Sequence, residues 1–334
     1  MKGLPMLKLK YLEENFKLAR MALVFYPHDE NTLEERMQRF RISANAVYPY
    51  ECDGKLCFLR MNPATEKSSP LIREELRFIQ LLLDKGYPAL KPILSLEGEY
   101  FRNLSTPWGV WCICAFEGVP GVPLEQVELT EEIITRYGEA LGQMHHISMQ
   151  IMIPPDRPNY LELMKWIRNV LEDAPYPLYR ECQEIRDALK EIPCHPFSVG
   201  MIHGDFELDN VFWDGEKCHV IDFDDCFVHF YSLDLLIALK ELPPEAAEAF
   251  LRGYRAACPE SRASEKDFPL MRRFLDLFQY ARIMYALSER PETEPDWMPG
   301  LVEKLEGRMA DLEKDIMAGR EQRRKEERRR ITGI

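Results

Sequence analysis

The stretch of sequence that decides the fold spans residues 199–239, and its centre reads IHGDFELDN at 202–210 and VIDFDD at 220–225. Three of its oxygen-bearing side chains, Asp205, Asn210 and Asp222, stand at spacings that suit one specific chemistry. Asp205 and Asn210 are separated by five positions in a polar segment. Such a segment predicts a loop that bends back so that both side chains face one site.

A short hairpin is predicted directly after this loop. Asn210 is followed by apolar residues at 211–213, by the turn signal Asp214-Gly215 and by a second apolar run at 218–223. The second strand would end at Asp222 and bring its carboxylate beside Asn210.

A carboxylate and a carboxamide that lie side by side can share a hard cation. Magnesium prefers oxygen ligands and keeps part of its coordination sphere for substrate phosphates, so Asn210 and Asp222 would suffice as protein ligands. Asp205 would then be free of metal and could orient or deprotonate a hydroxyl nucleophile.

This arrangement resembles the catalytic loop of protein-kinase-like enzymes. His-Gly-Asp at 203–205, in place of His-Arg-Asp, resembles the aminoglycoside phosphotransferase family, which includes choline kinase-like and homoserine kinase-like members. The resemblance extends over residues 38–290. It implies an α+β two-lobed protein-kinase-like fold, with a small antiparallel-sheet N-lobe and a larger, mostly helical C-lobe.

The division of the chain follows from the same resemblance. We expect a helical N-terminal extension at 1–37, a nucleotide-binding N-lobe at 38–116, a C-lobe that carries catalysis and acceptor binding at 117–320, and a charged, frayed tail at 321–334. Apolar periodicity predicts helices near 160–172, 179–190, 244–257, 267–290 and 297–330.

Length and composition agree with such a protein. The chain has 334 residues, of which 46% are hydrophobic and 30% charged, enough for one large globular domain or two lobes. It contains no run of the roughly 20 apolar residues that a membrane span needs. The start also lacks the apolar core of a signal peptide, so we expect a cytoplasmic protein without a membrane partner.

The net charge and the spacing of the cysteines limit which ligands the protein is expected to bind. The net charge of −13 disfavours nucleic acid as a general partner and is compatible with a cationic small substrate. The nine cysteines form no CxxC pair, and we expect reduced thiols rather than a metal site.

The resemblance also implies how the nucleotide is held. Arg60 stands in a predicted strand where the family usually has a Lys, and it keeps the positive charge that contacts the phosphates. Glu74 or Glu75, near the start of the next helix, could pair with Arg60, and Glu74 fits the alignment better. An ordinary surface salt bridge is the alternative for this pair.

Two further segments are expected to contact the nucleotide. The loop at 43–45 would cover the phosphates through Ser43 and Asn45, although it lacks the glycine typical of such loops. The strand before the Pro/Gly-rich crossing at 116–121 would line the adenine site. Its candidate residues are Ile113, Ala115 and Phe116.

Additional acidic residues surround the predicted chemistry. Glu207, Asp209, Asp224 and Asp225 would crowd toward one mouth and attract a cationic acceptor. Asp234 matches the family's downstream Asp, which braces the catalytic loop, and we assign it a structural role.

The function implied is magnesium-dependent transfer of the γ-phosphoryl group of ATP, with GTP left open, to a hydroxyl of a small molecule. An amine-bearing alcohol is favoured as the acceptor, while aminoglycosides, choline, homoserine and sugars stay open. A catalytically silent nucleotide-binding scaffold is the alternative, favoured by the altered phosphate loop and by Arg60. A protein kinase is disfavoured, because no Ala-Pro-Glu segment exists and only 11 residues separate Asp222 from Asp234. The oligomeric state stays open.

Overall fold

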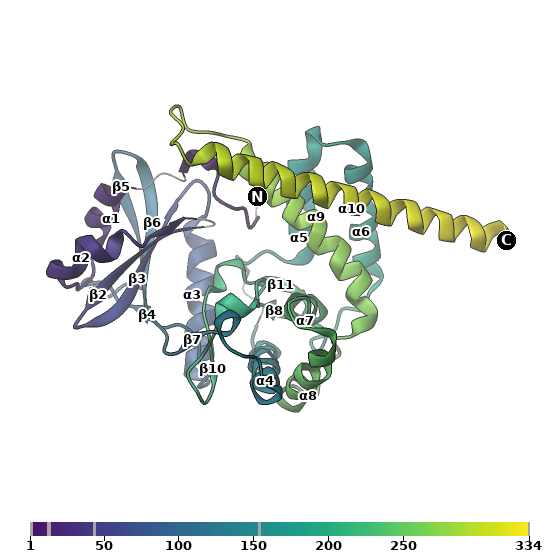
Figure 1. Cartoon of the computed structure of the whole chain (residues 1–334), viewed down its shortest axis with the longest axis horizontal. Helices are drawn as coiled ribbons and strands as arrows, with labels where there is room; N and C mark the ends of the chain where they lie inside the picture. Colours follow the sequence, from purple (N-terminus) through teal and green to yellow (C-terminus); the bar gives the residue numbers. More distant parts are fainter. Residues whose placement is uncertain (1–2, 12–14, 43–44, 153–154, 333–334) are drawn as a thin grey trace. The chain divides into compact units, whose positions relative to one another are not determined.

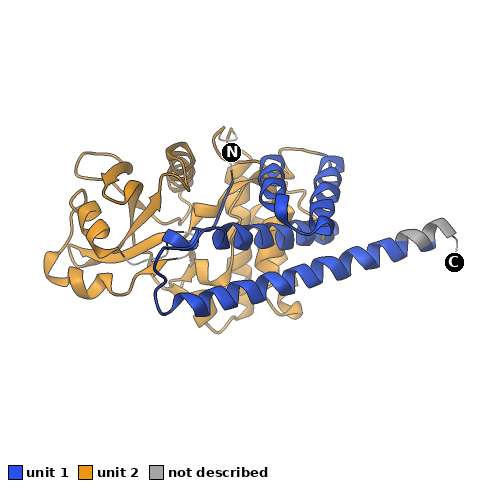
Figure 2. Ribbon diagram, turned by 90° about the horizontal axis from the view of Figure 1, so that it is seen from above, with its two compact units in different colours: residues 1–13, 160–193, 266–334 blue, residues 14–159, 194–265 orange. Residues whose placement is uncertain are grey.

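The computed structural model describes residues 3–11, 15–42, 45–152 and 155–332 (Figure 1). The chain divides into two compact units (Figure 2). Unit 1 comprises residues 1–13, 160–193 and 266–334, and unit 2 comprises 14–159 and 194–265. Unit 2 contains every residue predicted for the site, so the site can be described within one unit.

An antiparallel sheet forms the first part of unit 2. Its strand order is β1-β2-β3-β6-β4. Strand β5 pairs with residues 109–114 of β6, next to the residues of β6 that pair with β4. The turn between β2 and β3 is Asp53-Gly54, whose φ angles of 51° and 70° suit a two-residue hairpin turn. The strands are β1 (Arg41–Ile42), β2 (Ala46–Cys52), β3 (Lys55–Pro63), β4 (Pro92–Ile93), β5 (Phe101–Thr106) and β6 (Gly109–Glu117).

Helices cover both faces of this sheet. Helices α1 (Phe16–Leu23) and α2 (Glu30–Met37) lie on one side and α3 (Ser69–Asp84) on the other (Figure 1). The side chains of α3 that face the sheet recur at helical spacing, and Pro70 stands in its first turn. Among the buried apolar residues of α3 are Leu71, Leu76, Phe78, Ile79 and Leu82.

The second part of unit 2 is mostly helical. Helix α4 (Glu131–Ser148) packs closely on α8 (Ala247–Ala257) through glycines. A Cβ atom on Gly138 would lie 2.0 Å from the carbonyl oxygen of Phe250, and one on Gly253 would lie 2.0 Å from that of Thr135. The helices can approach this closely because these positions carry no side chain.

Short strands and one buried helix complete unit 2. Strand β8 (Val199–Ile202) pairs with β11 (Phe227–Phe230), and β9 (Val211–Trp213) lies between β10 (Cys218–Val220) and β7 (Val122–Pro123). Helix α7 (Tyr231–Leu239) follows β11 directly and is almost wholly buried. These pieces hold the loop that the sequence places at the centre of the fold.

Unit 1 is helical and joins segments far apart in sequence. It contains α5 (Tyr160–Val170), α6 (Tyr176–Glu191), α9 (Phe268–Leu287) and α10 (Met298–Thr332), which correspond to four of the predicted helices. Glu181 of α6 is buried and ion-paired with Arg273, Arg320 and Arg323. Burial alone would raise the pKa of Glu181, but hydrogen bonds and charges from these arginines lower it.

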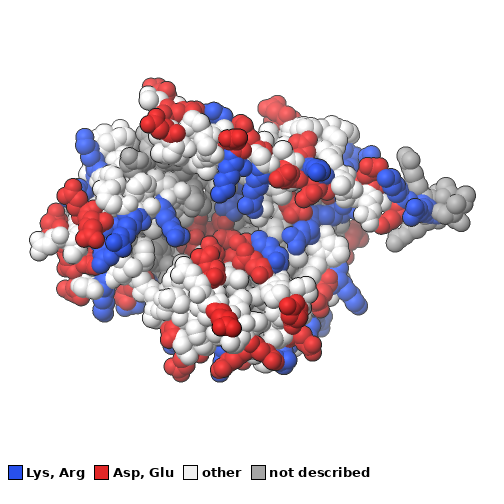
Figure 3. All heavy atoms as spheres, in the orientation of Figure 1, with Lys and Arg blue, Asp and Glu red and all other residues white. Residues whose placement is uncertain are grey.

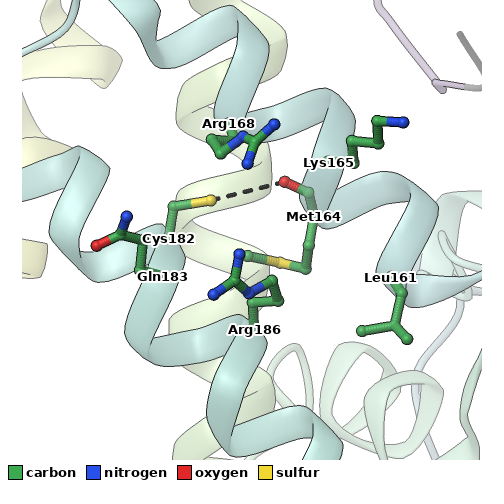
Figure 4. A pocket seen from close by; sticks show the side chains of 7 residues that line it. All are labelled: Leu161, Met164, Lys165, Arg168, Cys182, Gln183 and Arg186. Carbon is green, nitrogen blue, oxygen red and sulfur yellow. Dashed lines mark hydrogen bonds between the residues drawn. The ribbon is translucent and has the colours of Figure 1, made fainter.

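A cavity of about 240 Å³ lies between α5 and α6 (Figure 4). Three cationic side chains surround it, and the Cys182 thiol donates to the carbonyl oxygen of Met164 at 3.6 Å beside it. None of its lining residues is a predicted site residue. The lining residues are Leu161, Met164, Lys165, Arg168, Cys182, Gln183 and Arg186.

Acidic and basic side chains are interspersed on the face shown in Figure 3. Among the described residues, no helix is both long enough and apolar enough to cross a membrane.

Candidate active site

The predicted catalytic loop begins where β8 ends and turns at Gly204. This residue has a φ of +83°, in the region that favours glycine. A Cβ atom there would lie 2.5 Å from the carbonyl oxygen of Asp225. Glycine is therefore required both by the backbone conformation and by the close approach of the 222–226 segment.

Asp205 and Asn210 lie together, as their spacing predicts. The Asn210 side-chain amide donates to the backbone carbonyl and to the Oδ2 atom of Asp205, both at 3.0 Å. Residues 208–210 form the short 3-10 helix η4 (Leu208–Asn210), which returns the chain toward Asp205. Since both amide hydrogens face Asp205, the Oδ1 atom of Asn210 is the atom left to accept or to bind a cation.

The predicted hairpin is also present, and Asp222 follows the residue that is hydrogen-bonded to Asn210. Val211 of β9 pairs with Val220 of β10, and the Ile221 amide donates to the Asn210 carbonyl oxygen at 3.0 Å. Asp222 follows with a left-handed φ of 60°, and its side chain is exposed. The backbone turns here into η5 (Phe223–Asp225).

The electrostatics around Asp222 suit a cation. Desolvation of its carboxylate by the surrounding protein atoms, together with the negative charges of Asp224 and Asp225, raises its pKa to about 7. A divalent cation would offset that repulsion. The available oxygens of Asn210 and Asp222 therefore fit Mg²⁺, which takes oxygen ligands and few from the protein.

Asp234 braces the loop, as the sequence predicts. Its carboxylate accepts the backbone amides of His203 at 2.7 Å and of Gly204 at 2.8 Å, and it contacts His145 Nε2 at 3.1 Å. All four residues except Gly204 are fully buried. Burial would raise the pKa of Asp234, but the His145 hydrogen bond and nearby charges lower it.

His203 links the loop to the hairpin. Its Nε2 atom lies 2.9 Å from the carbonyl oxygen of Ile221, which can only accept, so Nε2 carries the proton. Its Nδ1 atom accepts the Asp205 amide at 3.3 Å. Burial lowers the pKa of His203, which agrees with a neutral ring that orders both segments of the site.

Arg60 on β3 is paired with Glu75, not with Glu74 as expected. Its two terminal nitrogens donate to the two Glu75 carboxylate oxygens at 2.7 and 2.9 Å, and both side chains are buried. Glu74 lies 3.7 Å from Arg77, and its side chain is 14% exposed. One position along a helix turns the side chain by about 100°, so only one of two adjacent glutamates can face the sheet.

Asp224 does not line an open mouth, which corrects the prediction for it. Its carboxylate is 3% exposed and bound to Lys67, and it lies 3.8 Å from Arg60. Burial would raise its pKa, but the charges of Lys67 and Arg60 lower it. Asp225 is also buried.

The other two predicted acceptor-facing acids lie in the loop. Glu207 is ion-paired with Lys240, and Asp209 is exposed. Burial and the charge of Glu207 raise the pKa of Asp209. Asp209 is thus the one of the four acids that combines exposure with a place in the catalytic loop.

The strand predicted to line the adenine site divides between the two faces of the sheet. Arg60 lies opposite Cys114 in the register, and its guanidinium is 5.0 Å from the centroid of the Phe116 ring. Strand alternation places Ile113 and Ala115 on the opposite face, which also carries Leu59. Of the three candidates, only Phe116 shares the face of Arg60.

In the loop predicted to cover the phosphates, Asn45 is buried and its Oδ1 atom accepts the Lys67 ammonium at 3.3 Å. Ser43 lies outside the described residues.

Sequence reasoning missed two buried cations, Lys67 and Arg157. One terminal nitrogen of Arg157 donates to the carbonyl oxygens of Asp224 and Cys226, both at 3.0 Å, and the other lies 3.3 Å from Glu75. Arg157 stands in a Pro-rich segment and Lys67 in the loop after β3. Neither position shows periodicity or a motif, and only their burial in the folded chain reveals them.

Comparisons with known proteins found a matching family and similar structures. A model of the phosphotransferase enzyme family matches residues 51–266. The amicoumacin kinase of Bacillus subtilis (strain 168) is 23% identical over 231 residues, which is 64% of this chain and 68% of that protein.

Two solved structures have a similar fold. An amicoumacin kinase in complex with AMP-PNP, Ca²⁺ and Ami matches with a TM-score of 0.70 and 20% identity, over 90% of this chain and 94% of that one. A microcompartment-associated aminopropanol kinase matches with a TM-score of 0.66 and 21% identity, over 91% of this chain and 98% of that one. These likenesses confirm the predicted protein-kinase-like fold.

Proposed function

Because the chain belongs to the phosphotransferase enzyme family, we propose that it transfers the γ-phosphoryl group of ATP to a hydroxyl of a small, amine-bearing molecule, with Mg²⁺. The observation that carries this proposal is the grouping of Asp205, Asn210 and Asp222 around one braced loop. A scaffold would need none of these three together.

Each residue then has a defined task. Asn210 Oδ1 and the Asp222 carboxylate would hold Mg²⁺, which neutralises negative charge on the phosphates when bound. Asp205 orients the acceptor hydroxyl and accepts its proton at a carboxylate oxygen. The two hydrogen bonds from the Asn210 amide fix the Asp205 carboxylate for that task.

The nucleotide is proposed to lie against the face of the sheet that carries Arg60 and Phe116. The buried Glu75 carboxylate holds the Arg60 guanidinium in one orientation. The AMP-PNP bound in the similar amicoumacin kinase structure supports ATP as the donor. A cytoplasmic location would fit an ATP-dependent enzyme.

Two observations suggest the chemical class of the acceptor. The names of the similar kinases, amicoumacin kinase and aminopropanol kinase, point to a small acceptor, and the second name points to an amino alcohol. Asp209 in the loop of this chain is exposed and could attract an ammonium group. Asp224 would not attract the acceptor, because its charge is neutralised by Lys67.

The first test separates a kinase from a silent scaffold. The melting temperature is measured with ATP, or GTP in parallel, in the presence and absence of Mg²⁺. A transferase site should be stabilised by nucleotide only when Mg²⁺ is present, since ligands that bind the native state raise its stability. Asp222→Ala should lose that metal dependence, and a variant that responds like the parent would place the metal elsewhere.

The second test addresses the acceptor. Small alcohols are screened for acceptor-dependent ATP consumption, and we expect amino alcohols or aminoglycosides to react before neutral sugars. If only neutral or anionic alcohols are phosphorylated, the argument from Asp209 fails while the kinase assignment stands.

A further inference from the structure

Lys67 is a buried cation beside the proposed nucleotide site with no role assigned so far. Its side chain is 1% exposed. The ammonium donates to the carboxylate of Asp224 and, at 3.3 Å, to Oδ1 of Asn45. It therefore bridges the segment that follows the metal ligand Asp222 and the residue that precedes β2, where the phosphate loop ends.

The backbone of Lys67 is fixed. Its amide donates to the carbonyl oxygen of Pro63 at 3.2 Å, and its carbonyl oxygen accepts the thiol of Cys112 at 3.8 Å. Helix α3 begins two residues later. The ammonium is thus presented from a rigid turn between β3 and α3, the two elements that supply Arg60 and Glu75.

Both neighbouring cations keep donors that the described residues do not use. Glu75 accepts two of the five N–H groups of Arg60, and the Nε atom of Arg60 is buried without a hydrogen-bond partner among the described residues. An ammonium has three hydrogens, and the described residues accept two of those on Lys67. A third donor is therefore left on the cation that lies between Asn45 and Asp224.

The carboxylate of Asp224 lies between the two cations. A single carboxylate faces two cations there, since Lys67 binds it and Arg60 lies within 3.8 Å. Phosphate oxygens form charge-assisted hydrogen bonds with the same donors, and an ammonium binds phosphate as a point charge that needs no fixed plane.

We propose that Lys67 is a second phosphate-binding residue, which contacts the nucleotide together with Arg60, and that Asp224 holds its ammonium in place between nucleotide-binding events. This inference rests on the proposed function. The competing explanation is a purely structural ion pair that ties the sheet to the 222–226 segment.

The experiment compares ligands that differ only in phosphate number. Dissociation constants of adenosine, AMP, ADP and ATP, each with Mg²⁺, are measured by calorimetry for the parent and for Lys67→Met. We expect affinity for adenosine to change less than about twofold and affinity for ATP to fall about tenfold or more, since one charged contact is lost. The step in the series at which the loss begins identifies the phosphate.

Two further variants distinguish the loss of a phosphate contact from misfolding of the protein. Lys67→Met together with Asp224→Asn removes both charges of the pair, so no buried charge is left unpaired, and it should show the same selective loss. Lys67→Arg keeps the charge and should bind ATP within a few-fold of the parent. Lys85→Met, an exposed lysine of unit 2 just after α3, is the matched control and should bind all four ligands normally.

The outcomes are distinct. An equal loss for adenosine and ATP, or no loss for ATP in the folded double variant, would overturn the assignment of Lys67. If the parent binds none of the phosphorylated ligands, it is the proposed function that fails.

Discussion

Asp205 is the single residue on which the proposed chemical step depends most. In Asp205→Asn, the loss of the carboxylate should lower phosphoryl transfer by about two orders of magnitude or more, because no group remains to accept the hydroxyl proton. Binding of ATP with Mg²⁺ should persist, since Asn210 and Asp222 are intact. Turnover is measured with the acceptor found in the screen, and undiminished turnover would contradict the role of Asp205.

Glu75 and Glu74 provide a matched pair of variants. Glu75→Gln removes the carboxylate that is hydrogen-bonded to the buried guanidinium of Arg60 and leaves only Asp224, at 3.8 Å, as its counter-charge, so the free energy of unfolding should fall by about 3 kcal/mol. It should also weaken ATP binding, because Arg60 is then no longer held in one orientation. Glu74→Gln removes only an ion pair of 3.7 Å between this partly buried side chain and the exposed Arg77, and it should cost less, about 1 kcal/mol.

Urea denaturation measures the free energy of unfolding of both variants, and ATP titration measures their affinity for ATP. If the two substitutions lower these quantities equally, Arg60 is not paired selectively with Glu75.

At the scale of elements, the tight turn at Gly204 packs the proposed catalytic loop against the 222–226 segment. Gly204→Ala introduces a Cβ atom 2.5 Å from the carbonyl oxygen of Asp225, and Gly204 also has a left-handed φ. The variant should lose stability by well over the roughly 1–2 kcal/mol that this backbone conformation costs an alanine, and it should lose activity because the segment of Asp222 must shift.

Gly215→Ala is the control for that prediction. Gly215 also has a left-handed φ, of +101°, but a Cβ atom there meets nothing within 4 Å. Only the conformational cost should appear in its melting temperature, and activity should be kept. If both alanine variants lose the same stability and keep the same activity, the close approach at Gly204 does not affect function.

At the scale of the whole molecule, thiol exposure gives a simple measure of folding. All nine cysteines are free, Cys194 is exposed, Cys52 is partly exposed and the other seven are buried. An excess of a thiol reagent should therefore modify one cysteine quickly and a second more slowly in the native protein. All nine should react after unfolding, because accessibility limits the reaction of buried thiols.

Mass spectrometry after brief labelling identifies the modified positions. Rapid labelling of Cys114 or Cys226, which flank the Arg60 and Asp224 cluster in sequence or register, would contradict the buried site described here.

The sequence by itself determined the parts of this protein whose signals are local. The spacing of Asp205, Asn210 and Asp222 and the turn signal at Asp214-Gly215 predicted a loop and a hairpin, and both are present. These features depend on a few neighbouring residues, so their geometry is encoded within about twenty positions. Family membership and the phosphotransferase class follow from the same stretch and are confirmed.

Only the tertiary structure decided the partners of the buried charges. Whether Glu74 or Glu75 faces Arg60 depends on how α3 is rotated against the sheet, and that rotation is set by its whole apolar stripe. Asp224 was expected at an open mouth, yet it is neutralised by Lys67, which is 157 positions away in the chain. The partner of a buried carboxylate is the cation that the packing of distant elements brings close to it. No local pattern in the sequence identifies that cation.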